Sequence, residues 1–224
     1  HFVESLDERT LKVVKAERIN IEWIVRGFLY GSAWRAYAKG VRMISGVRLP
    51  NGLIYGEKLD EPILTPTFKS DTGHDAELTK EIAVSEGLLS VDEWNELEEA
   101  CFKLYSFYNS FAERVGLIIA DVKFEFGRYD SGLIQIDEAP THDSARIWTK
   151  KYYRPGFSQE RYCLDKEFFR AYLMRKGFMG FGAFPKIPFK IIRQVAWRVR
   201  GSYDVLSSHV TVEDLPLKDL SDVV

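Results

Sequence analysis

Cysteine is scarce in this sequence, and the two that occur, Cys101 and Cys163, lie far apart. Neither belongs to a CxxC motif or has the spacing to histidine that a zinc site requires. A disulfide framework or a structural zinc ion is therefore not expected, and both thiols suit a reducing compartment. The sequence also lacks an apolar run of membrane-spanning length and a signal-peptide pattern at its start, so we expect a cytoplasmic protein.

A strong excess of charge of one sign is also missing, because the formal net charge is −2 and the pI about 6.2. We therefore expect neither nucleic acid nor a membrane surface as a partner. Local groups of Arg and Lys would have to bind any anion, which suits a small phosphorylated ligand. What the chain has in plenty is apolar residues, 46% of the total, which can form a large core.

The patterning of apolar residues predicts an α+β fold without internal repeats. Ser90 and Glu93 have the spacing of a capping box, and a helical apolar stripe that includes Cys101 and Phe111 follows them up to Gly116. The other predicted elements are strands at 11–15 and 19–25, loop and short strands at 45–66, a hairpin of strands 116–127 and 133–137, and helices at 165–176 and 188–206.

The predicted hairpin carries three charged residues on one face. Alternation along its first strand places Asp121, Lys123 and Glu125 together, while the intervening residues are apolar. The second strand ends in Asp137, close to where Glu125 would face it. Carboxylates that converge from adjacent strands repel each other unless a cation lies between them, and Mg²⁺ prefers carboxylate oxygens. A solvated sheet face with cross-strand ion pairs explains the alternating charges equally well.

A polar loop, residues 141–148, follows the hairpin. Its guanidinium, Arg146, could bind a phosphate or a carboxylate through two parallel hydrogen bonds. A surface loop with a single ion pair is an equally good reading of this segment.

Five ordered motifs in this chain resemble the phosphoribosylaminoimidazole-succinocarboxamide synthase (SAICAR synthetase) family. They are VRGFLYGSAW at 25–34, PILTPTFK at 62–69 followed by His74-Asp75, DVKFEFG at 121–127, Asp137-Glu138 with DSARIW at 143–148, and LDKEFFR at 164–170. The resemblance implies a ligase of de novo purine biosynthesis that uses ATP and Mg²⁺. Such an enzyme joins L-aspartate to 5-amino-1-(5-phospho-D-ribosyl)imidazole-4-carboxylate, or carboxyaminoimidazole ribonucleotide, through an acyl phosphate, and releases SAICAR, ADP and phosphate.

The resemblance also implies roles for individual residues. Glu125 and Asp137 would bind Mg²⁺, and Lys123 would act beside them as a catalytic residue. The implied substrate-binding residues are Arg26, Ser32, Ser144, Arg146, Asp165, Lys166 and Arg170 for the imidazole nucleotide, and Lys69 and Asp75 for L-aspartate. The implied nucleotide-side residues are Lys15, Arg18, Asn20 and Glu22. Helix capping would explain Asp165 equally well.

The sequence departs from the family pattern at Glu167 and His142, whose roles stay open. The match begins at His1, late in the family's N-terminal β-rich lobe. We therefore expect a two-lobed ATP-binding fold of ATP-grasp or kinase-like type with that lobe largely absent: residues 1–25 would be its remnant and 26–224 the substrate- and metal-binding part. The alternatives are a small-molecule kinase of the same superfamily and a non-catalytic fragment. A homo-oligomer is compatible with the sequence, which does not determine the oligomeric state.

Overall fold

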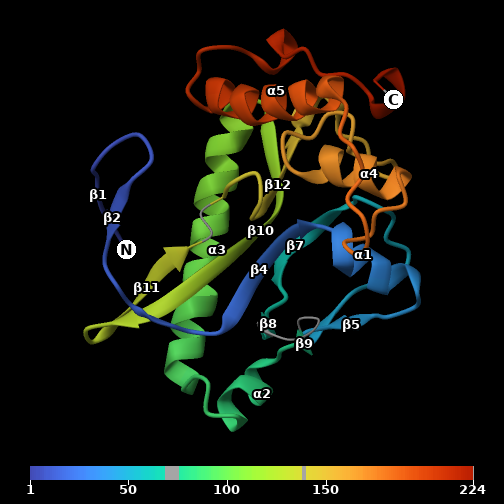
Figure 1. The fold of residues 1–224 in the computed structure, drawn as a ribbon. Coiled ribbons are helices and arrows are strands. Elements are labelled where there is room, and N and C mark those ends of the chain that lie inside the picture. Colours follow the sequence, from blue (N-terminus) through green and yellow to red (C-terminus); the bar gives the residue numbers. More distant parts are fainter. Residues whose placement is uncertain (69–75, 138–139, 224) are drawn as a thin grey trace.

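A computed structural model describes residues 1–68, 76–137 and 140–223 (Figure 1). The strands are β1 (Phe2–Ser5), β2 (Leu11–Val13), β3 (Glu17–Arg18), β4 (Ile21–Phe28), β5 (Met43–Ile44), β6 (Val47–Arg48), β7 (Lys58–Leu64), β8 (Thr67–Phe68), β9 (Ala76–Glu77), β10 (Leu117–Tyr129), β11 (Gly132–Asp137) and β12 (Ala145–Thr149). The helices are α1 (Gly31–Ala38), α2 (Lys80–Ser85), α3 (Val91–Arg114), α4 (Glu167–Arg175) and α5 (Phe189–Leu206), with 3-10 turns η1 (Lys150–Tyr152), η2 (Val212–Asp214) and η3 (Leu220–Asp222).

Strand β10 organises the main sheet, which has eight strands within the described residues. It pairs antiparallel with β3, β4, β11 and β12, and β4 in turn pairs with β7 and β8. The predicted hairpin is confirmed, but its connection is shorter than expected. β10 and β11 are joined by Asp130 and Ser131 alone, and Asp130 has the positive φ of 54° that such a tight turn requires.

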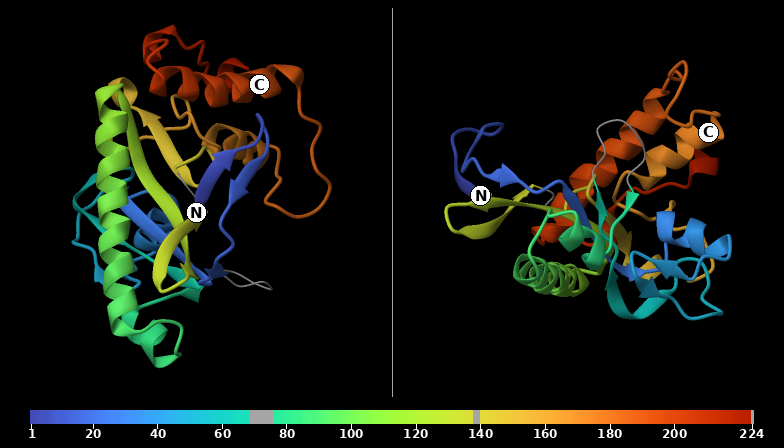
Figure 2. Two further views of the ribbon diagram at one scale, coloured as in Figure 1. Left: turned by 90° about the vertical axis from the view of Figure 1, so that its left-hand side faces the viewer. Right: turned by 90° about the horizontal axis from the view of Figure 1, so that it is seen from below.

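Helix α3 covers one face of this sheet (Figure 1, Figure 2). The predicted capping box is present, because the Ser90 hydroxyl accepts from the Glu93 amide and the Glu93 carboxylate accepts from the Ser90 amide. Cys101 is buried as expected, but the prediction that Phe111 packs in the core is wrong, since it is 42% exposed. The buried row passes instead through Tyr105, whose hydroxyl turns inward and donates to the Ile119 carbonyl at 2.8 Å.

Helices α4 and α5 pack on the opposite face, where α5 lies across the end of α3 (Figure 1, Figure 2). Phe168 and Ile191 from these helices join Ile118 and Trp148 in a second apolar cluster. The first part of β10 is therefore buried on both faces, which explains its uninterrupted apolar run. Both helices start within two residues of the predicted positions, and neither they nor the other described helices are long and apolar enough to cross a membrane.

The N-terminal strands β1 and β2 form an exposed hairpin apart from the main sheet, beside β11 (Figure 1). The predicted strand at 11–15 corresponds to the shorter β2, and the one at 19–25 to β4, which continues to Phe28. The fold is α+β, as predicted. The expected division between residues 25 and 26 falls inside β4, and separate roles for the two parts stay a prediction.

A close contact between β4 and α3 restricts position 27 to glycine. A Cβ atom at Gly27 would lie 2.0 Å from the Tyr105 hydroxyl oxygen and 3.0 Å from its ring. We predict that Gly27→Ala lowers the free energy of unfolding by about 2 kcal/mol, measured by urea denaturation, because the buried ring has little room to move. Gly132→Ala is the matched control, since nothing lies within 4 Å of a Cβ there. Equal stability of the two variants would contradict this packing.

Candidate functional site

Two β-bulges aim the acidic side chains of β10 and β11 at one face of the sheet. In β10 the pairing with β12 is irregular at Ala120, between Ile119 and Asp121. Residues 117 and 119 contact the α3 cluster before this point, and residues 122, 124 and 126 contact it afterwards. The bulge therefore moves Asp121 and the alternate residues that follow away from the core beneath α3.

The second bulge sets the partner of Glu125. Phe126 pairs with Gln135, whereas Glu125 pairs with Asp137, which leaves Ile136 as the extra residue of β11. Opposed residues of an antiparallel ladder share a face. Regular pairing would have placed Asp137 opposite the buried Phe124, but the bulge places it opposite Glu125 as the sequence predicted.

Lys123 lies between two acidic residues of the same face. Its Nζ donates to Glu22 Oε1 at 2.7 Å and lies 3.7 Å from Glu125 Oε1. Glu22 and Glu125 are both buried, with 8% and 4% exposure. The cross-strand ion pairs of the alternative reading are thus present, but the burial of the carboxylates contradicts a solvated sheet face. They also place Glu22 beside the predicted catalytic residues.

The donor atoms of Glu125 and Asp137 suit a hard cation. Both residues offer carboxylate oxygens, and Mg²⁺ commonly takes one or two carboxylates and completes its shell with water and phosphate oxygens. No group of three or more His, Cys, Asp or Glu side chains within the described residues is arranged as a metal site. The pair therefore fits Mg²⁺ bound together with a phosphorylated ligand better than a metal held by protein alone.

A buried carboxylate holds two arginines beside this face. Arg146 donates through Nη1 to Asp121 Oδ2 at 2.6 Å, and Arg26 reaches the same oxygen at 3.4 Å. Arg26 also donates to the hydroxyls of Thr65 and Ser32, at 2.8 and 3.0 Å. Burial lowers the pKa of Arg26, and Asp121 counteracts this. Sequence analysis placed Asp121 on the correct face but gave it no role, and its alternation with Lys123 was the available signal.

A glycine lets Arg146 approach the start of α1. Gly31 has a φ of 58°, and a Cβ there would lie 2.5 Å from Arg146 Nη2. The guanidinium also stands 5.3 Å from the centre of the Tyr30 ring, within cation–π range. Glycine at position 31 thus leaves room for the guanidinium of Arg146, one of the predicted substrate-binding residues.

These side chains surround a cavity of about 240 Å³, here called the substrate cavity. The predicted site residues that line it are Glu22, Arg26, Ser32, Lys123, Ser144, Arg146, Lys166 and Arg170. They come from β4, α1, β10, β12, α4 and the segments leading into β12 and α4. The basic side chains of the lining (Arg26, Lys123, Arg146, Lys166 and Arg170) outnumber the acidic ones (Glu22, Asp121, Asp143 and Glu167) by one. Asp143 and Glu167 form ion pairs with Lys166 at 2.6 Å and Arg170 at 3.2 Å. The convergence of cationic donors on one cavity suits an anionic ligand.

Asp165 lies below the substrate cavity rather than in its wall. Its carboxylate accepts from the Ile147 and Glu167 amides, both at 2.7 Å, so it caps the first turn of α4 and ties it to β12. His142 points the other way and contacts Ser202 of α5. Ser144 caps its own loop by accepting from the Thr141 amide at 2.9 Å.

The remaining predicted residues are not brought to the substrate cavity. Lys15, Arg18 and Asn20 lie on the segment before β4, where Arg18 Nε donates to Asn20 Oδ1 at 3.0 Å and Arg18 pairs with Gly127. Lys69 and Asp75 lie outside the described residues.

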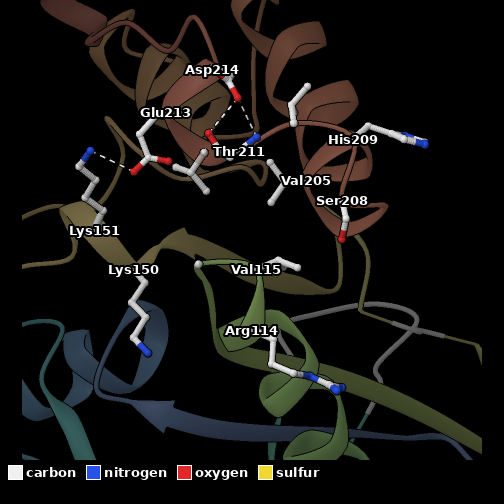
Figure 3. A pocket seen from close by; sticks show the side chains of 13 residues that line it. Arg114, Val115, Lys150, Lys151, Val205, Ser208, His209, Thr211, Glu213 and Asp214 are labelled. Carbon is white, nitrogen blue, oxygen red and sulfur yellow. Dashed lines mark hydrogen bonds and ion pairs between the residues drawn. The ribbon is translucent and has the colours of Figure 1, made fainter.

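A separate cavity of about 560 Å³ lies at the C-terminal end of α3, against the 3-10 turn η2 (Figure 3). Lys151 pairs there with Glu213 at 3.0 Å, while Arg114 and His209 point away from the apolar centre near Val115. Because apolar side chains lie at its centre and its basic groups do not converge there, this cavity is a poorer candidate for binding an anion than the substrate cavity.

The fold and site thus define an α+β protein in which arginines and lysines converge on one cavity beside two facing carboxylates. The sequence profile of the SAICAR synthetase family matches residues 1–179. The phosphoribosylaminoimidazole-succinocarboxamide synthase of Thermodesulfovibrio yellowstonii is 37% identical over 207 residues, which are 92% of this chain and 69% of that protein. The synthase of Bacteroides thetaiotaomicron is 37% identical over 213 residues, 94% of this chain and 67% of that protein. The chain belongs to the SAICAR synthetase family.

Solved structures support the same assignment. The SAICAR synthase of Saccharomyces cerevisiae, complexed with SAICAR, superposes with a TM-score of 0.78 at 31% identity and covers 93% of this chain and 74% of that one. A SAICAR synthetase in complex with ADP shares the fold with a TM-score of 0.67 at 24% identity, over 93% of this chain and 71% of that one.

The contacts of Asp121 with Arg26 and Arg146 predict that loss of its charge lowers the stability of the fold. In Asp121→Asn the buried Arg26 and the partly buried Arg146 would lose their shared carboxylate, so we expect the free energy of unfolding to fall by about 3 kcal/mol. Urea denaturation measures this, and Asp60→Asn, at an exposed position of β7, is the matched control. A loss no larger than that of the control would show that Asp121 is not the shared counter-ion.

The buried carboxyl group of Asp165 predicts that the free energy of unfolding depends on pH. Burial raises its pKa from the ordinary 3.8 to about 7, although the two amide hydrogen bonds act against this. Between these values the folded state binds more protons than the unfolded state, so Asp165 makes stability fall as pH rises from about 4 to about 7. Comparison of urea unfolding with Asp165→Asn isolates this slope, and NMR titration of the carboxyl carbon gives the pKa directly. Titration near 4 would refute the prediction.

Proposed function

We propose that this chain is an ATP-dependent ligase of de novo purine biosynthesis. It joins L-aspartate to carboxyaminoimidazole ribonucleotide through an acyl phosphate and yields SAICAR, ADP and phosphate. The observation that carries the proposal is the convergence of Arg26, Lys123 and Arg146 on one cavity beside the Glu125–Asp137 pair, in a member of the SAICAR synthetase family. The SAICAR bound to the yeast relative supports the same product.

The imidazole nucleotide carries a phosphate and a carboxylate, and the substrate cavity offers a place for each. Arg26 and Arg146 are rigid because Asp121 orients both, so they can bind phosphate without a large loss of side-chain entropy. Ser32 adds a hydroxyl to that end. Lys123, held beside Glu125, neutralises the carboxylate that reacts.

Glu125 and Asp137 would hold Mg²⁺. When bound, the ion neutralises the phosphate oxygens on which charge develops during phosphoryl transfer. Glu22 and Lys123 contribute from the protein side: the Glu22 carboxylate accepts from the Lys123 ammonium and holds it on the face that carries Glu125.

The outer parts of the site belong to the same proposal. Lys15, Arg18 and Asn20 would contact the ATP nucleotide, and Lys69 and Asp75 would contact L-aspartate. Lys166 and Arg170 extend the anion-binding edge of the substrate cavity, with Asp165 holding the start of α4 beneath them. The arrangement agrees with a two-lobed, ATP-grasp or kinase-like ATP-binding fold acting in the cytoplasm.

A turnover assay tests the proposal. The protein is incubated with Mg·ATP and carboxyaminoimidazole ribonucleotide, with and without L-aspartate, and ADP and SAICAR are followed. The ligase forms both together, and only when aspartate is present at steady state. ADP formed without aspartate in amounts that match a phosphorylated product would identify a small-molecule kinase. The absence of ADP under all conditions would leave only a non-catalytic role.

Glu125 gives the sharper prediction. In Glu125→Gln a ligand charge is lost with little change in volume, so we expect kcat to fall at least about a hundredfold at fixed Mg²⁺ while the unfolding midpoint changes little. Glu99→Gln is the matched control, because this glutamate is exposed on α3 and pairs only with Lys103. A variant that unfolds but keeps its activity per folded molecule would refute the metal assignment.

A further inference from the structure

Glu167, one of the two positions at which the sequence departs from the family pattern, is an acidic residue of the substrate cavity. It is the first residue of α4, and its amide donates to the buried Asp165 carboxylate at 2.7 Å. This bond fixes the backbone from which the side chain extends. Glu167 Oε2 lies 3.5 Å from Arg146 Nε and 3.2 Å from Arg170 Nη1, so the carboxylate stands among the cations that line the cavity.

The guanidinium of Arg146 has one edge that hydrogen bonds within the described residues leave open. Its Nη1 donates to Asp121 at 2.6 Å, whereas its Nε is buried and has no hydrogen-bond partner. A phosphate that binds an arginine side-on through two parallel hydrogen bonds uses Nε together with Nη2. Nη2 lies against Gly31, where a Cβ atom would come within 2.5 Å of it. The open edge is therefore available to the phosphate of the imidazole nucleotide.

Glu167 stands at that same edge of Arg146. At 3.5 Å from Nε its carboxylate attracts the guanidinium without forming a hydrogen bond. Burial opposes the charged form of Arg146, but Asp121 and then Glu167 raise its pKa above the ordinary value. Since Asp121 already orients the guanidinium through a hydrogen bond, Glu167 adds negative charge at the open edge and little orientation. A phosphate that takes this edge has to displace the carboxylate, because two anions so close together repel each other.

We propose that Glu167 is an exchangeable counter-ion of Arg146, which the phosphate of the imidazole nucleotide displaces when it binds. This inference rests on the proposed function, which supplies the phosphorylated substrate. Asp121 is the permanent counter-ion, because its carboxylate is buried and is shared with Arg26. Arg170, which lies three residues along α4 and is 42% exposed, gives the displaced carboxylate a partner closer to solvent.

The exchange limits how tightly the substrate cavity holds a phosphate ester. The lining has five basic and four acidic side chains, so removal of the Glu167 charge would raise its excess of positive charge from one to two. The product SAICAR keeps the phosphate of the imidazole nucleotide and therefore leaves from the same edge of Arg146. A carboxylate that returns to the guanidinium offsets part of the cost of separating it from that phosphate. Glu167 thus weakens substrate binding and favours product release.

The variant Glu167→Gln tests the exchange, because glutamine keeps the size of the side chain and removes its charge. We expect KM for the imidazole nucleotide, and Ki for SAICAR as a product inhibitor, both to fall about tenfold. KM for Mg·ATP and for L-aspartate should stay unchanged, and kcat should fall because the more tightly held SAICAR leaves more slowly. Glu167→Asp keeps the charge and should return KM for the imidazole nucleotide toward the wild-type value.

Glu81→Gln is the matched control. Glu81 also lies in the first turn of a helix, α2, but it does not line the substrate cavity. The control therefore removes the same favourable interaction with a helix dipole and should leave all kinetic constants unchanged. A raised KM for the imidazole nucleotide in Glu167→Gln would identify Glu167 as an orienting partner of Arg146 and overturn the inference. An unchanged KM would overturn it as well.

Titration calorimetry with SAICAR separates this inference from the proposed function, because it requires no turnover. Tighter binding of SAICAR by Glu167→Gln than by wild type supports the exchange, and equal or weaker binding overturns it. Absence of SAICAR formation by the wild-type protein in the turnover assay would reject the proposed function, whatever the calorimetric result.

Discussion

The carboxylate of Asp121 is the constraint on which the site depends. Two guanidiniums at the base of one cavity repel each other, and burial adds to the cost of keeping them charged. One buried carboxylate oxygen, 2.6 Å from Arg146 and 3.4 Å from Arg26, serves both, and Glu167 at 3.5 Å is a second partner of Arg146. Because Arg26 and Arg146 both line the substrate cavity, the position of this one carboxylate affects its geometry.

Strand β10 carries both that carboxylate and Glu125, and its pairing with β11 places Asp137 opposite Glu125. Its first part is buried between α3 and the α4–α5 layer, so it cannot shift without disturbing two apolar clusters. The second part of β10 packs one face against the α3 cluster and turns the other face toward the substrate cavity. Functional groups on a strand fixed at both ends are held more rigidly than groups on loops, which suits chemistry that relies on positioning.

Much of this arrangement could be predicted from sequence. Alternation identified the face with Lys123 and Glu125, and the capping box identified the start of α3, because both signals depend on local periodicity. The role of Asp121 was missed because a carboxylate that serves two arginines distant in sequence leaves no local pattern. Phe111 was wrongly placed in the core because helical spacing cannot show which of two adjacent apolar rows contacts the sheet.

The bulge at Ile136 makes the facing of Glu125 and Asp137 depend on the register of the hairpin as well as on the identity of the two residues. If the bulge were lost while β11 kept its length, regular pairing would place Asp137 opposite Phe124 although both carboxylates remained in the sequence. Loss of one residue of β11 together with the bulge would instead keep the two carboxylates opposite each other. Divergence of this hairpin is therefore constrained in bulge and length together, a restriction that residue-by-residue comparison of the two carboxylates would not reveal.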